Sequence, residues 1–393
     1  MAWWPLAVLC VTEVVSWGVL YYALPVALAA ITADTGWSTT SVTAAFSAGL
    51  VVSAVAGVPV GRWLDRTGPR PVMTAGSVLA TAATVGIASA PTLAWFAVAW
   101  LIAGIAMAAV FYQAAFAALT RWYGPARVRA LTVLTLAAGL ASTVFAPLTS
   151  VLLAHLDWRS TYLVLAGVLA AVTVPLHAMG LSLPWSPTGH RTHGGHVGRV
   201  DVSAVVTSRP FALLATALTL TAFGLYAASL TLIPLLTARG MGAGLAAVAL
   251  GLLGAGQLLG RVGWVPLTAR TTAPVRTALV VAGSAVAVAL LAAVPGPGWL
   301  LVALAVLAGA VRGAGTLLQA TVVADRWGTE RYGSLAGWFA APITAASALA
   351  PFGGTLIASW VGGYPAAFAV LAAVISLGGI AAWAAEPRRP TAR

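Results

Sequence analysis

Three charged side chains, Glu13, Arg261 and Arg312, lie within apolar stretches that are each long enough to cross a lipid bilayer. A charge near the centre of a bilayer costs about 3 kcal/mol or more, so each group requires an opposite charge or a water-filled cavity. Ionisable residues in membrane spans generally mark sites for ions, protons or charged substrates. The chemistry predicted for this chain is therefore the binding and transfer of charged species inside a membrane.

Glu13 is the only carboxylate that the sequence places deep in an apolar stretch, about 13 Å from its start at 1.5 Å per residue. Trp17 and Tyr21 follow at intervals of four residues, so one helical face carries an acid, an indole and a phenol. We expect Glu13 to bind a proton or a charged substrate. The alternative is a structural role in which Glu13 pairs with a group on a neighbouring helix.

Two arginines predict an anion site. Arg312 lies near the middle of its stretch, and Thr316 and Gln319 extend it into a polar stripe that is unsuited to lipid. Arg261 follows Gln257 by four residues, about 10 Å from one end of its stretch. The alternative for either arginine is that its long side chain reaches the headgroups. A permanently charged, planar, bidentate donor suits carboxylate-like or phosphonate-like anions. The predicted substrate-binding residues are Arg312, Arg261, Gln257, Gln319, Tyr21, Trp17 and Gln113.

The composition excludes a soluble globular protein. Hydrophobic residues make up 61% of the chain and charged residues 7%, whereas soluble proteins carry about 25% charged residues. The net charge of +12 comes from arginine alone, because the chain contains no lysine. Such an excess in a soluble protein would suggest nucleic acid as a partner. Here the arginines lie mainly between apolar stretches, where they determine orientation in a membrane, and no nucleic acid is expected.

Other kinds of chemistry lack the residues that they need. We find no Ser/His/Asp arrangement and no phosphate-binding loop in the sequence, which argues against an enzyme and against ATP-driven transport. The single cysteine, Cys10, lies in the first apolar stretch, so no disulfide is expected. His190, His193 and His196 have the spacing of metal ligands, but they lie in a Gly-rich link without acids or cysteines. We therefore expect no cofactor and no metal.

The predicted fold is an all-α membrane protein with twelve transmembrane helices in two pseudo-symmetric six-helix halves. We expect an N-terminal half over 1–183, a cytoplasmic linker over 184–208 and a C-terminal half over 209–393. The spans are Trp4–Ala29, Thr39–Val60, Arg70–Ala90, Leu93–Thr120, Arg129–His155, Ser160–Leu183, Arg209–Ala238, Gly242–Leu267, Val275–Val294, Trp299–Ala324, Tyr332–Ser359 and Pro365–Ala385. Tryptophans near span ends are predicted interfacial anchors: Trp95, Trp100, Trp158, Trp299 and Trp360.

Similar residues recur in the two halves. Gly104 and Arg121 in the first half correspond to Gly309 and Arg326 in the second, at one common offset. Several matches at one offset indicate an internal duplication. The arginines also predict orientation: with both termini cytoplasmic, sixteen lie on that side, and only Arg159 and Arg239 lie on the other.

A short basic link over residues 57–70 joins the second and third spans. It contains Gly61, Asp65, Arg66, Gly68 and Arg70. This pattern resembles the G-x-x-x-D-R-x-G-R/K-R/K loop between helices 2 and 3 of the major facilitator superfamily. The alternative is an ordinary cytoplasmic loop that is basic only for reasons of topology.

With twelve spans, two halves and this loop, the whole chain resembles a major facilitator transporter. The resemblance implies that Asp65 contacts the start of the eleventh span near Gly333 and Ser334 and closes the cytoplasmic side, with Arg66 and Arg70 as basic partners. Trp17-Gly18 and Gly36-Trp37-Ser38 resemble the branch of oxalate/formate exchangers and monocarboxylate transporters, where an arginine at the position of Arg261 binds substrate. Gln257 stands where animal monocarboxylate carriers hold an aspartate, so their proton-relay pair is not reproduced.

These patterns together predict a secondary active transporter with alternating access, which moves a small organic anion coupled to protons through Glu13. The alternatives are a proton-driven exporter of hydrophobic drugs or metabolites and a membrane sensor that does not transport. We expect a monomer in a bacterial inner membrane, with a small-molecule substrate, protons and the lipid bilayer as partners.

Overall fold

The structure, a computed structural model, describes residues 3–185 and 201–385 as an all-helical protein. The first nine α-helices are α1 Trp4–Trp17, α2 Ala23–Thr35, α3 Thr39–Thr67, α4 Pro69–Ala88, α5 Leu93–Val110, α6 Tyr112–Tyr123, α7 Arg127–Ala138, α8 Ala141–His155 and α9 Trp158–Gly180. The remaining helices are α10 Val202–Val206, α11 Arg209–Leu230, α12 Leu232–Ala238, α13 Ala243–Arg270, α14 Ala273–Ala293, α15 Gly298–Trp327, α16 Tyr332–Trp360 and α17 Tyr364–Ala384.

Within the described residues, eleven helical stretches are long and apolar enough to cross a membrane. One of them, Leu93–His155, has 63 residues. This is far longer than one crossing requires, and a 3₁₀ turn at Gly124–Ala126 divides it into two parts, α5 with α6 and α7 with α8, so it accounts for two crossings. The predicted fold class, an all-α protein with about twelve spans, is confirmed.

The chain divides into two compact units. The first comprises Met1–Val200 with Gly328–Ala341, and the second comprises Asp201–Trp327 with Pro342–Arg393. The division passes through α16, whose first residues cluster with the first unit. Residues 186–200 of the predicted linker, with His190, His193 and His196, lie outside the described residues.

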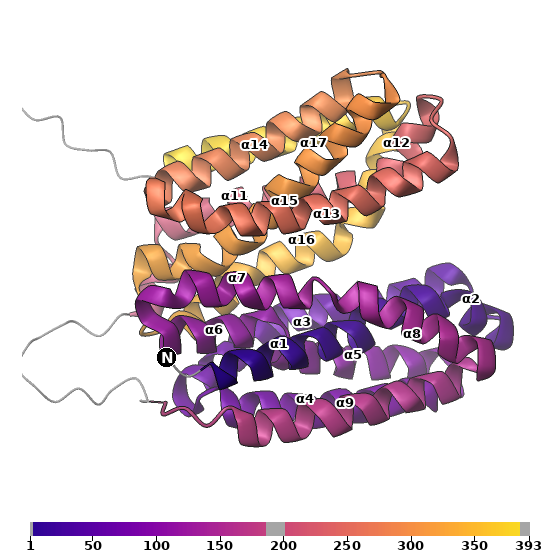
Figure 1. Cartoon of the computed structure of the whole chain (residues 1–393), viewed down its shortest axis with the longest axis vertical. Helices are drawn as coiled ribbons and strands as arrows, with labels where there is room; N and C mark the ends of the chain where they lie inside the picture. The colour runs from indigo at the N-terminus through magenta and orange to yellow at the C-terminus, as the bar shows by residue number, and fades with distance from the viewer. Residues whose placement is uncertain (1–2, 186–200, 386–393) are drawn as a thin grey trace, which may run out of the picture. The chain divides into compact units, whose positions relative to one another are not determined.

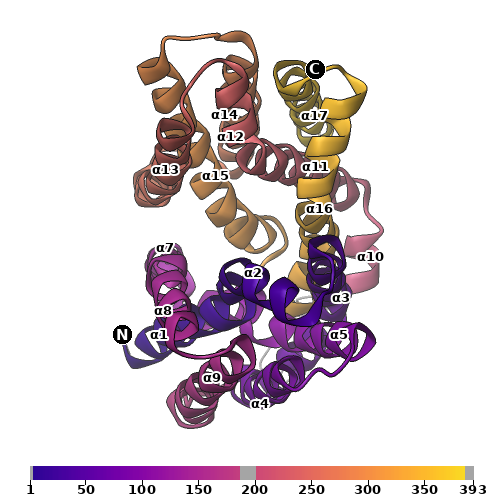
Figure 2. The same cartoon turned by 90° about the vertical axis from the view of Figure 1, so that its right-hand side faces the viewer.

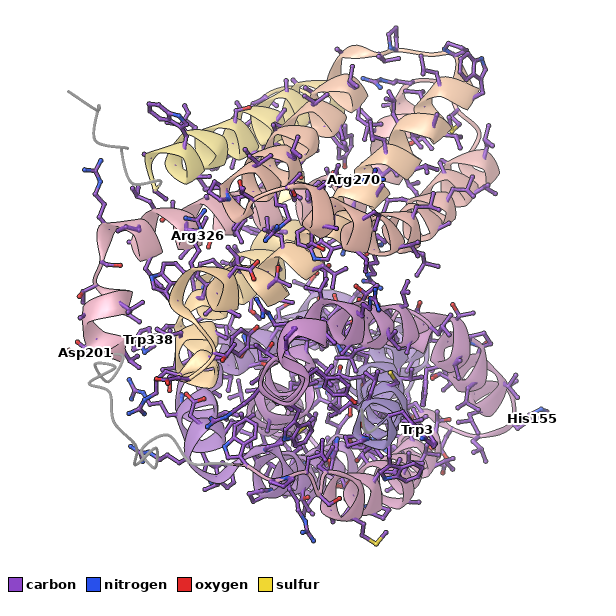
Figure 3. The ribbon with its side chains drawn as sticks, turned by 60° about the vertical axis from the view of Figure 1, so that its left-hand side comes forward. Trp3, His155, Asp201, Arg270, Arg326 and Trp338 are labelled. Atoms are coloured by element: carbon purple, nitrogen blue, oxygen red, sulfur yellow. The ribbon has the colours of Figure 1, made fainter. Side chains whose placement is uncertain are left out.

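In the first unit α4 packs between α5 and α9, α3 packs against α5, and α1 contacts α7 and α9 (Figure 1). Small residues allow the close approach of α3 and α5. A methyl group on Gly104 would overlap the carbonyl of Gly49, and one on Gly49 would lie 2.5 Å from the carbonyl oxygen of Trp100. His155, at the end of α8, is exposed and points away from these helices (Figure 3).

In the second unit α13 packs along α15, while α17 contacts both α11 and α14 (Figure 2). Here a methyl group on Gly309 would overlap the carbonyl of Leu253. The pairs Gly104–Gly49 and Gly309–Leu253 therefore make the same kind of contact between corresponding helices. This agreement supports the duplication that the sequence predicts.

Several spans are interrupted near their middle. The first span has a π-helical segment, Gly18–Tyr22, between α1 and α2. Extended backbone at Phe111 separates α5 from α6, and a turn at Gly139 separates α7 from α8. Such breaks free backbone groups and commonly accompany binding sites in membrane proteins.

The tryptophan prediction is partly wrong. Trp95, Trp299 and Trp360 are at least half exposed, as expected of residues that meet lipid or headgroups, but Trp100 and Trp158 are buried. Trp158 donates from Nε1 to Asp34 at 2.8 Å, and Trp100 packs against Phe46 and Phe96. Position near a span end therefore does not distinguish a lipid-facing indole from a packed one.

Candidate functional site

Glu13 lies in α1 with no exposed surface. One carboxyl oxygen, Oε2, accepts a hydrogen bond of 2.8 Å from Nε1 of Trp17. Among the described residues, Oε1 has no hydrogen-bond partner. A buried, charged carboxyl oxygen without a donor is expensive; a bound proton would remove the charge, and a donor on a ligand would supply the missing hydrogen bond. The structure thus brings together two residues that the spacing predicted to share one face.

Trp17, the hydrogen-bond partner of Glu13, lies among three other aromatic rings. The Trp17 ring stacks on Phe111 with 4.1 Å between centroids and an interplanar angle of 8°. Tyr112 and Tyr21 lie 5.1 and 5.3 Å from it. Because Phe111 is the break between α5 and α6, and Tyr21 belongs to the π-helical segment, two interrupted spans meet at one indole. We call Trp17, Tyr21, Phe111 and Tyr112 the aromatic cluster.

Arg312 projects from α15 in the second unit and is half-buried. Its guanidinium carbon lies 4.0 Å from the centroid of Tyr226 on α11, a cation–π contact. Over the part of the second unit that the structure describes, no carboxylate lies within ion-pair distance of Arg312. The charge therefore lies against an aromatic face, and none of these described acids neutralises it.

The other predicted polar residues are distributed as follows. Arg261 on α13 is buried, with 7% of its surface exposed. Gln257, one turn earlier, and Gln319 on α15 are half-buried. Gln113 does not join the aromatic cluster, because its side-chain amide packs against Gly57 of α3 and lines a small cavity.

The α3–α4 junction, defined as residues 57–70, holds the first turn of α16. Oδ1 of Asp65 accepts the N–H of Gly333 at 3.0 Å, and Oδ2 accepts the N–H and hydroxyl of Ser334 at 2.7 and 2.6 Å. First-turn amides have no acceptor within their own helix, and a carboxylate suits the positive end of the helix dipole. A methyl group on Gly61 would overlap the carbonyl of Gly333, and Gly68 ends α3 at φ +84°, which favours glycine.

The arginines of the junction have other partners. Arg70 donates from Nε to the carbonyl of Ala178 on α9 at 2.6 Å. Arg66 is exposed. The Arg62 guanidinium carbon lies 5.8 Å from the ring centroid of Trp338, which projects from α16 (Figure 3). The arginine whose charge acts on Asp65 is instead Arg121, at the end of α6.

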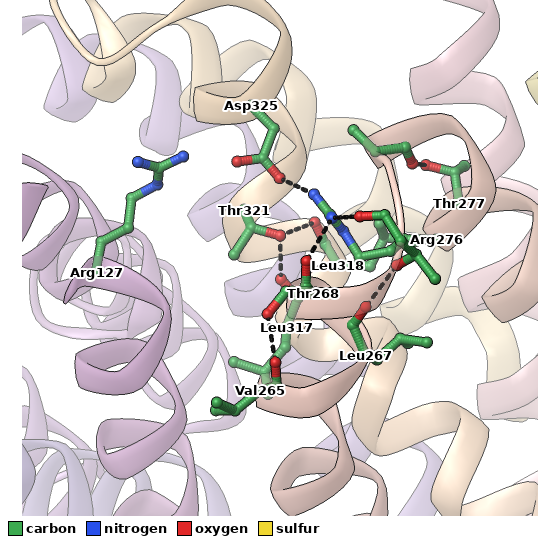
Figure 4. Close-up of polar contacts among 12 residues, drawn as sticks. Arg127, Val265, Leu267, Thr268, Arg276, Thr277, Leu317, Leu318, Thr321 and Asp325 are labelled. Atoms are coloured by element: carbon green, nitrogen blue, oxygen red, sulfur yellow. Dashed lines mark hydrogen bonds and ion pairs between the residues drawn. The ribbon is translucent and has the colours of Figure 1, made fainter. Parts of the chain in front are cut away.

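A second polar cluster joins three helix ends in the second unit (Figure 4). Arg276, at the start of α14, donates to Asp325 on α15 at 2.8 Å and to the carbonyl of Thr271 at 2.6 Å. The side chains of Arg276 and Asp325 are 10% and 13% exposed, so the ion pair is largely shielded from water. The sequence assigns Arg276 only to topology, whereas the structure gives it a buried partner.

Asp157, which lies outside the spans, has a shifted pKa. Asp157 precedes α9, and its oxygens accept the N–H and hydroxyl of Ser160 at 2.8 and 2.9 Å. These hydrogen bonds stabilise the charged form and lower the pKa of Asp157 below its ordinary value. Asp157 thus caps the N-terminus of α9.

Sequence reasoning missed Phe111, Tyr226 and Arg121 as partners of the predicted residues. Phe111 and Tyr226 are aromatic residues in apolar surroundings, so only the fold shows which ring meets which. The sequence did single out Arg121, because it recurs as Arg326 at the corresponding helix end. It did not connect Arg121 to Asp65.

Comparison with solved structures supports the fold. The E. coli fucose:proton symporter FucP superposes with a TM-score of 0.74 at 16% identity, over 98% of each chain. The human organic anion transporter MFSD10 gives a TM-score of 0.72 at 17% identity, over 96% of this chain and 98% of that one. At these identities the likeness shows the fold alone.

Sequence comparison identifies the family. A curated relative, an uncharacterized MFS-type transporter YcxA of Bacillus subtilis, is 28% identical over 130 residues. The match covers 32% of this chain and 31% of that protein, so it spans about a third of its length. The family model of the Major Facilitator Superfamily, a family of transporters and not of enzymes, matches residues 9–299, most of the chain. This multi-pass membrane protein belongs to the Major Facilitator Superfamily.

Proposed function

We propose that the chain is a secondary active transporter that moves a small, carboxylate-like organic anion by alternating access, coupled to protons. The observation that carries the substrate class is the setting of Arg312, a permanent charge in a membrane helix with an aromatic ring against it. An anion that enters the site can form bidentate hydrogen bonds with the guanidinium while Tyr226 covers one face. Arg261, which is buried, adds a second positive charge in the same unit.

The proposed branch of the superfamily rests on Arg261 and on two residues of the first span. Arg261 and the Trp17-Gly18 pair favour the oxalate/formate and monocarboxylate branch, whose members bind organic acids. In this proposal Gln257 and Gln319 supply neutral hydrogen bonds to the substrate. The sequence predicts that Gln113 also binds the substrate. Gln257 stands where the animal monocarboxylate carriers have an aspartate. Proton coupling in this chain therefore has to use another carboxylate.

Glu13 is the proposed proton site. Its Oε2 is held by Trp17, and its Oε1 is buried without a donor among the described residues. A proton on Oε1 removes the charge, and its release restores it. If burial of Glu13 differs between the conformations of the transporter, proton binding is coupled to the conformational change.

Asp65 and the α3–α4 junction are the proposed cytoplasmic gate. The three hydrogen bonds from Gly333 and Ser334 hold the start of α16 to α3. In this proposal their formation and loss accompany closing and opening of the cytoplasmic side. The proposal also includes a cytoplasmic location for both chain termini.

The substrate proposal is tested by a binding screen of the purified protein against carboxylates, phosphonates and lipophilic cations. We expect at least one small carboxylate to stabilise the protein. Arg312→Ala should weaken its binding by at least about thirtyfold, the effect of truncating a desolvated arginine that pairs with a carboxylate. Arg312→Lys should recover only part of the affinity, because lysine lacks the planar fork. Arg129→Ala, which removes an exposed arginine, is the matched control. Unchanged anion affinity in Arg312→Ala would refute the proposal.

A second candidate, export of hydrophobic drugs or metabolites, is favoured by the aromatic cluster. An aromatic cluster whose central indole is bonded to a buried carboxyl group resembles sites for lipophilic cations, which bind through cation–π and charge interactions. The same screen separates the candidates, because lipophilic cations should then bind through Trp17 and Glu13 and be indifferent to Arg312. Substrate flux into proteoliposomes separates both from a sensor that does not transport.

A further inference from the structure

Trp185 lies five residues beyond the end of α9, where it packs on the α3–α4 junction. A methyl group on Gly68 would lie 2.8 Å from Cγ of Trp185, so the indole rests on the backbone of the junction. Its Nε1 donates to the carbonyl oxygen of Asp65 at 3.3 Å. Trp122 of α6 meets the ring edge-on, with centroids 6.2 Å apart. Three contacts from two segments therefore fix a single half-buried side chain.

The Trp185 ring also covers Arg121. The guanidinium carbon lies 4.4 Å from the ring centroid, the distance of a cation–π contact. The charge of Arg121 acts on Asp65 and on Glu330, which precedes α16. Arg121 thus faces the indole while its charge is felt by both sides of the contact between α3 and α16.

From these contacts we propose that Trp185 is a positioning residue of the cytoplasmic gate: its indole holds Arg121 in place and thereby strengthens the attachment of α16 to Asp65. This inference rests on the proposed gating role of Asp65. It adds a residue from outside the junction that the family pattern does not include.

The physical reason is the environment that an aromatic face provides for an arginine. A guanidinium on a ring keeps its in-plane N–H groups available, while the ring excludes water from one face. Less water between Arg121 and Asp65 strengthens their attraction. An aliphatic side chain of similar size would exclude water but would not attract the cation. The ring itself, more than its volume, should therefore determine the effect.

The test measures attachment of α16 without any substrate. Spin labels are placed at Thr67→Cys on α3 and Thr329→Cys before α16, in a Cys10→Ser background that removes the single native cysteine. The distance between labels on the full-length protein in lipid nanodiscs gives the populations of attached and detached α16. Asp65→Asn is the reference variant that weakens the attachment directly.

We expect Trp185→Leu to reduce the ratio of attached to detached populations by about tenfold, which equals about 1.4 kcal/mol. Trp185→Phe keeps a ring over Arg121 and loses only the N–H donor, so its ratio should stay within about threefold of the parent. Trp95→Ala is the matched control, because it removes an indole that also donates one hydrogen bond, to the carbonyl of Gly86. If Trp185→Leu does not fold, Trp185→Met fills the space without a ring and is expected to give the same reduction.

Two results would overturn the inference. One is an unchanged ratio in the leucine and methionine variants while Asp65→Asn shifts it. The other is an equal shift in the phenylalanine and leucine variants, which would show that the ring has no special role. An unchanged ratio in Asp65→Asn would instead refute the proposed gate, and the role of Trp185 would fall with it.

Discussion

Replacement of Asp65 by asparagine tests how strongly the α3–α4 junction holds α16. The carboxylate accepts three hydrogen bonds through two oxygens, one at Oδ1 and two at Oδ2. Asparagine is nearly the same size, so the change alters charge and acceptors and leaves packing intact. Its single oxygen can still accept both bonds from Ser334, but its amide nitrogen then faces the N–H of Gly333.

The magnitude follows from this count. The variant loses at least one hydrogen bond to a charged acceptor, about 1.5–3 kcal/mol, and leaves a buried donor unsatisfied. Loss of the charge at the N-terminus of α16 removes about 0.3–1 kcal/mol more. The total of about 2–4 kcal/mol corresponds to a factor of about 30 to 1000 in the local opening equilibrium.

Hydrogen–deuterium exchange measures that equilibrium at the amides of Gly333 and Ser334. In Asp65→Asn these amides should exchange faster by the same factor, because they have no other acceptor in the first turn. Peptides from α4 and α9 should exchange as in the parent and report an intact fold. Asp201→Asn, which weakens a carboxylate cap on α10, is the matched control and should leave the two amides unchanged. Unaltered exchange at Gly333 and Ser334 in a folded Asp65→Asn protein would refute the reasoning.

Three further predictions concern other carboxyl groups. Glu13→Gln should abolish uptake driven by a pH gradient in proteoliposomes while ligand binding and exchange persist, and active pH-driven uptake by this variant would contradict the proton role. Asp325→Ala should destabilise the protein by about 3–5 kcal/mol in thermal or denaturant unfolding, because it leaves the buried charge of Arg276 unpaired. Adding Arg276→Met should restore part of that loss, and an additive double variant would show that the pair is not coupled. Because the pKa of Asp157 is lowered in the folded state, its contribution is present above the ordinary pKa and is lost as the pH falls through the lower folded value. Melting temperatures should therefore fall less steeply below about pH 4 in Asp157→Asn than in the parent, and identical slopes would exclude this role.

Hydropathy was sufficient to predict the spans because a bilayer requires long apolar stretches and leaves few alternatives. The contact of Asp65 with Gly333 and Ser334 was accessible through the motif, which fixes the chemistry of both partners. Hydropathy carries no information on the interruption at Phe111, because both sides of the break are apolar. Nor does it show which helix faces of an apolar bundle meet, and so the stacking of Trp17 on Phe111 was not predicted.

Charged residues at span ends presented a different difficulty. From its position at a span end, Arg276 is predicted only to set the orientation of the chain in the membrane. The positive-inside rule concerns only the side of the membrane on which a charge lies. Its ion pair with Asp325 depends on the meeting of α13, α14 and α15, which are joined by packing of small residues and not by any local signal. Arg121 shows the same limitation, since its contact with Trp185 joins residues that are distant in sequence.

The two units share their packing but not their polar chemistry. Gly104 and Gly309 make equivalent close contacts between corresponding helices, as the predicted internal duplication requires. The acids, by contrast, have different partners: Asp65, near the end of α3, accepts hydrogen bonds from the start of α16, whereas Asp325, near the end of α15, forms an ion pair with Arg276. The first unit carries the buried acid Glu13 and the second carries Arg312, so the proposed proton site and the proposed anion site belong to different units of the chain.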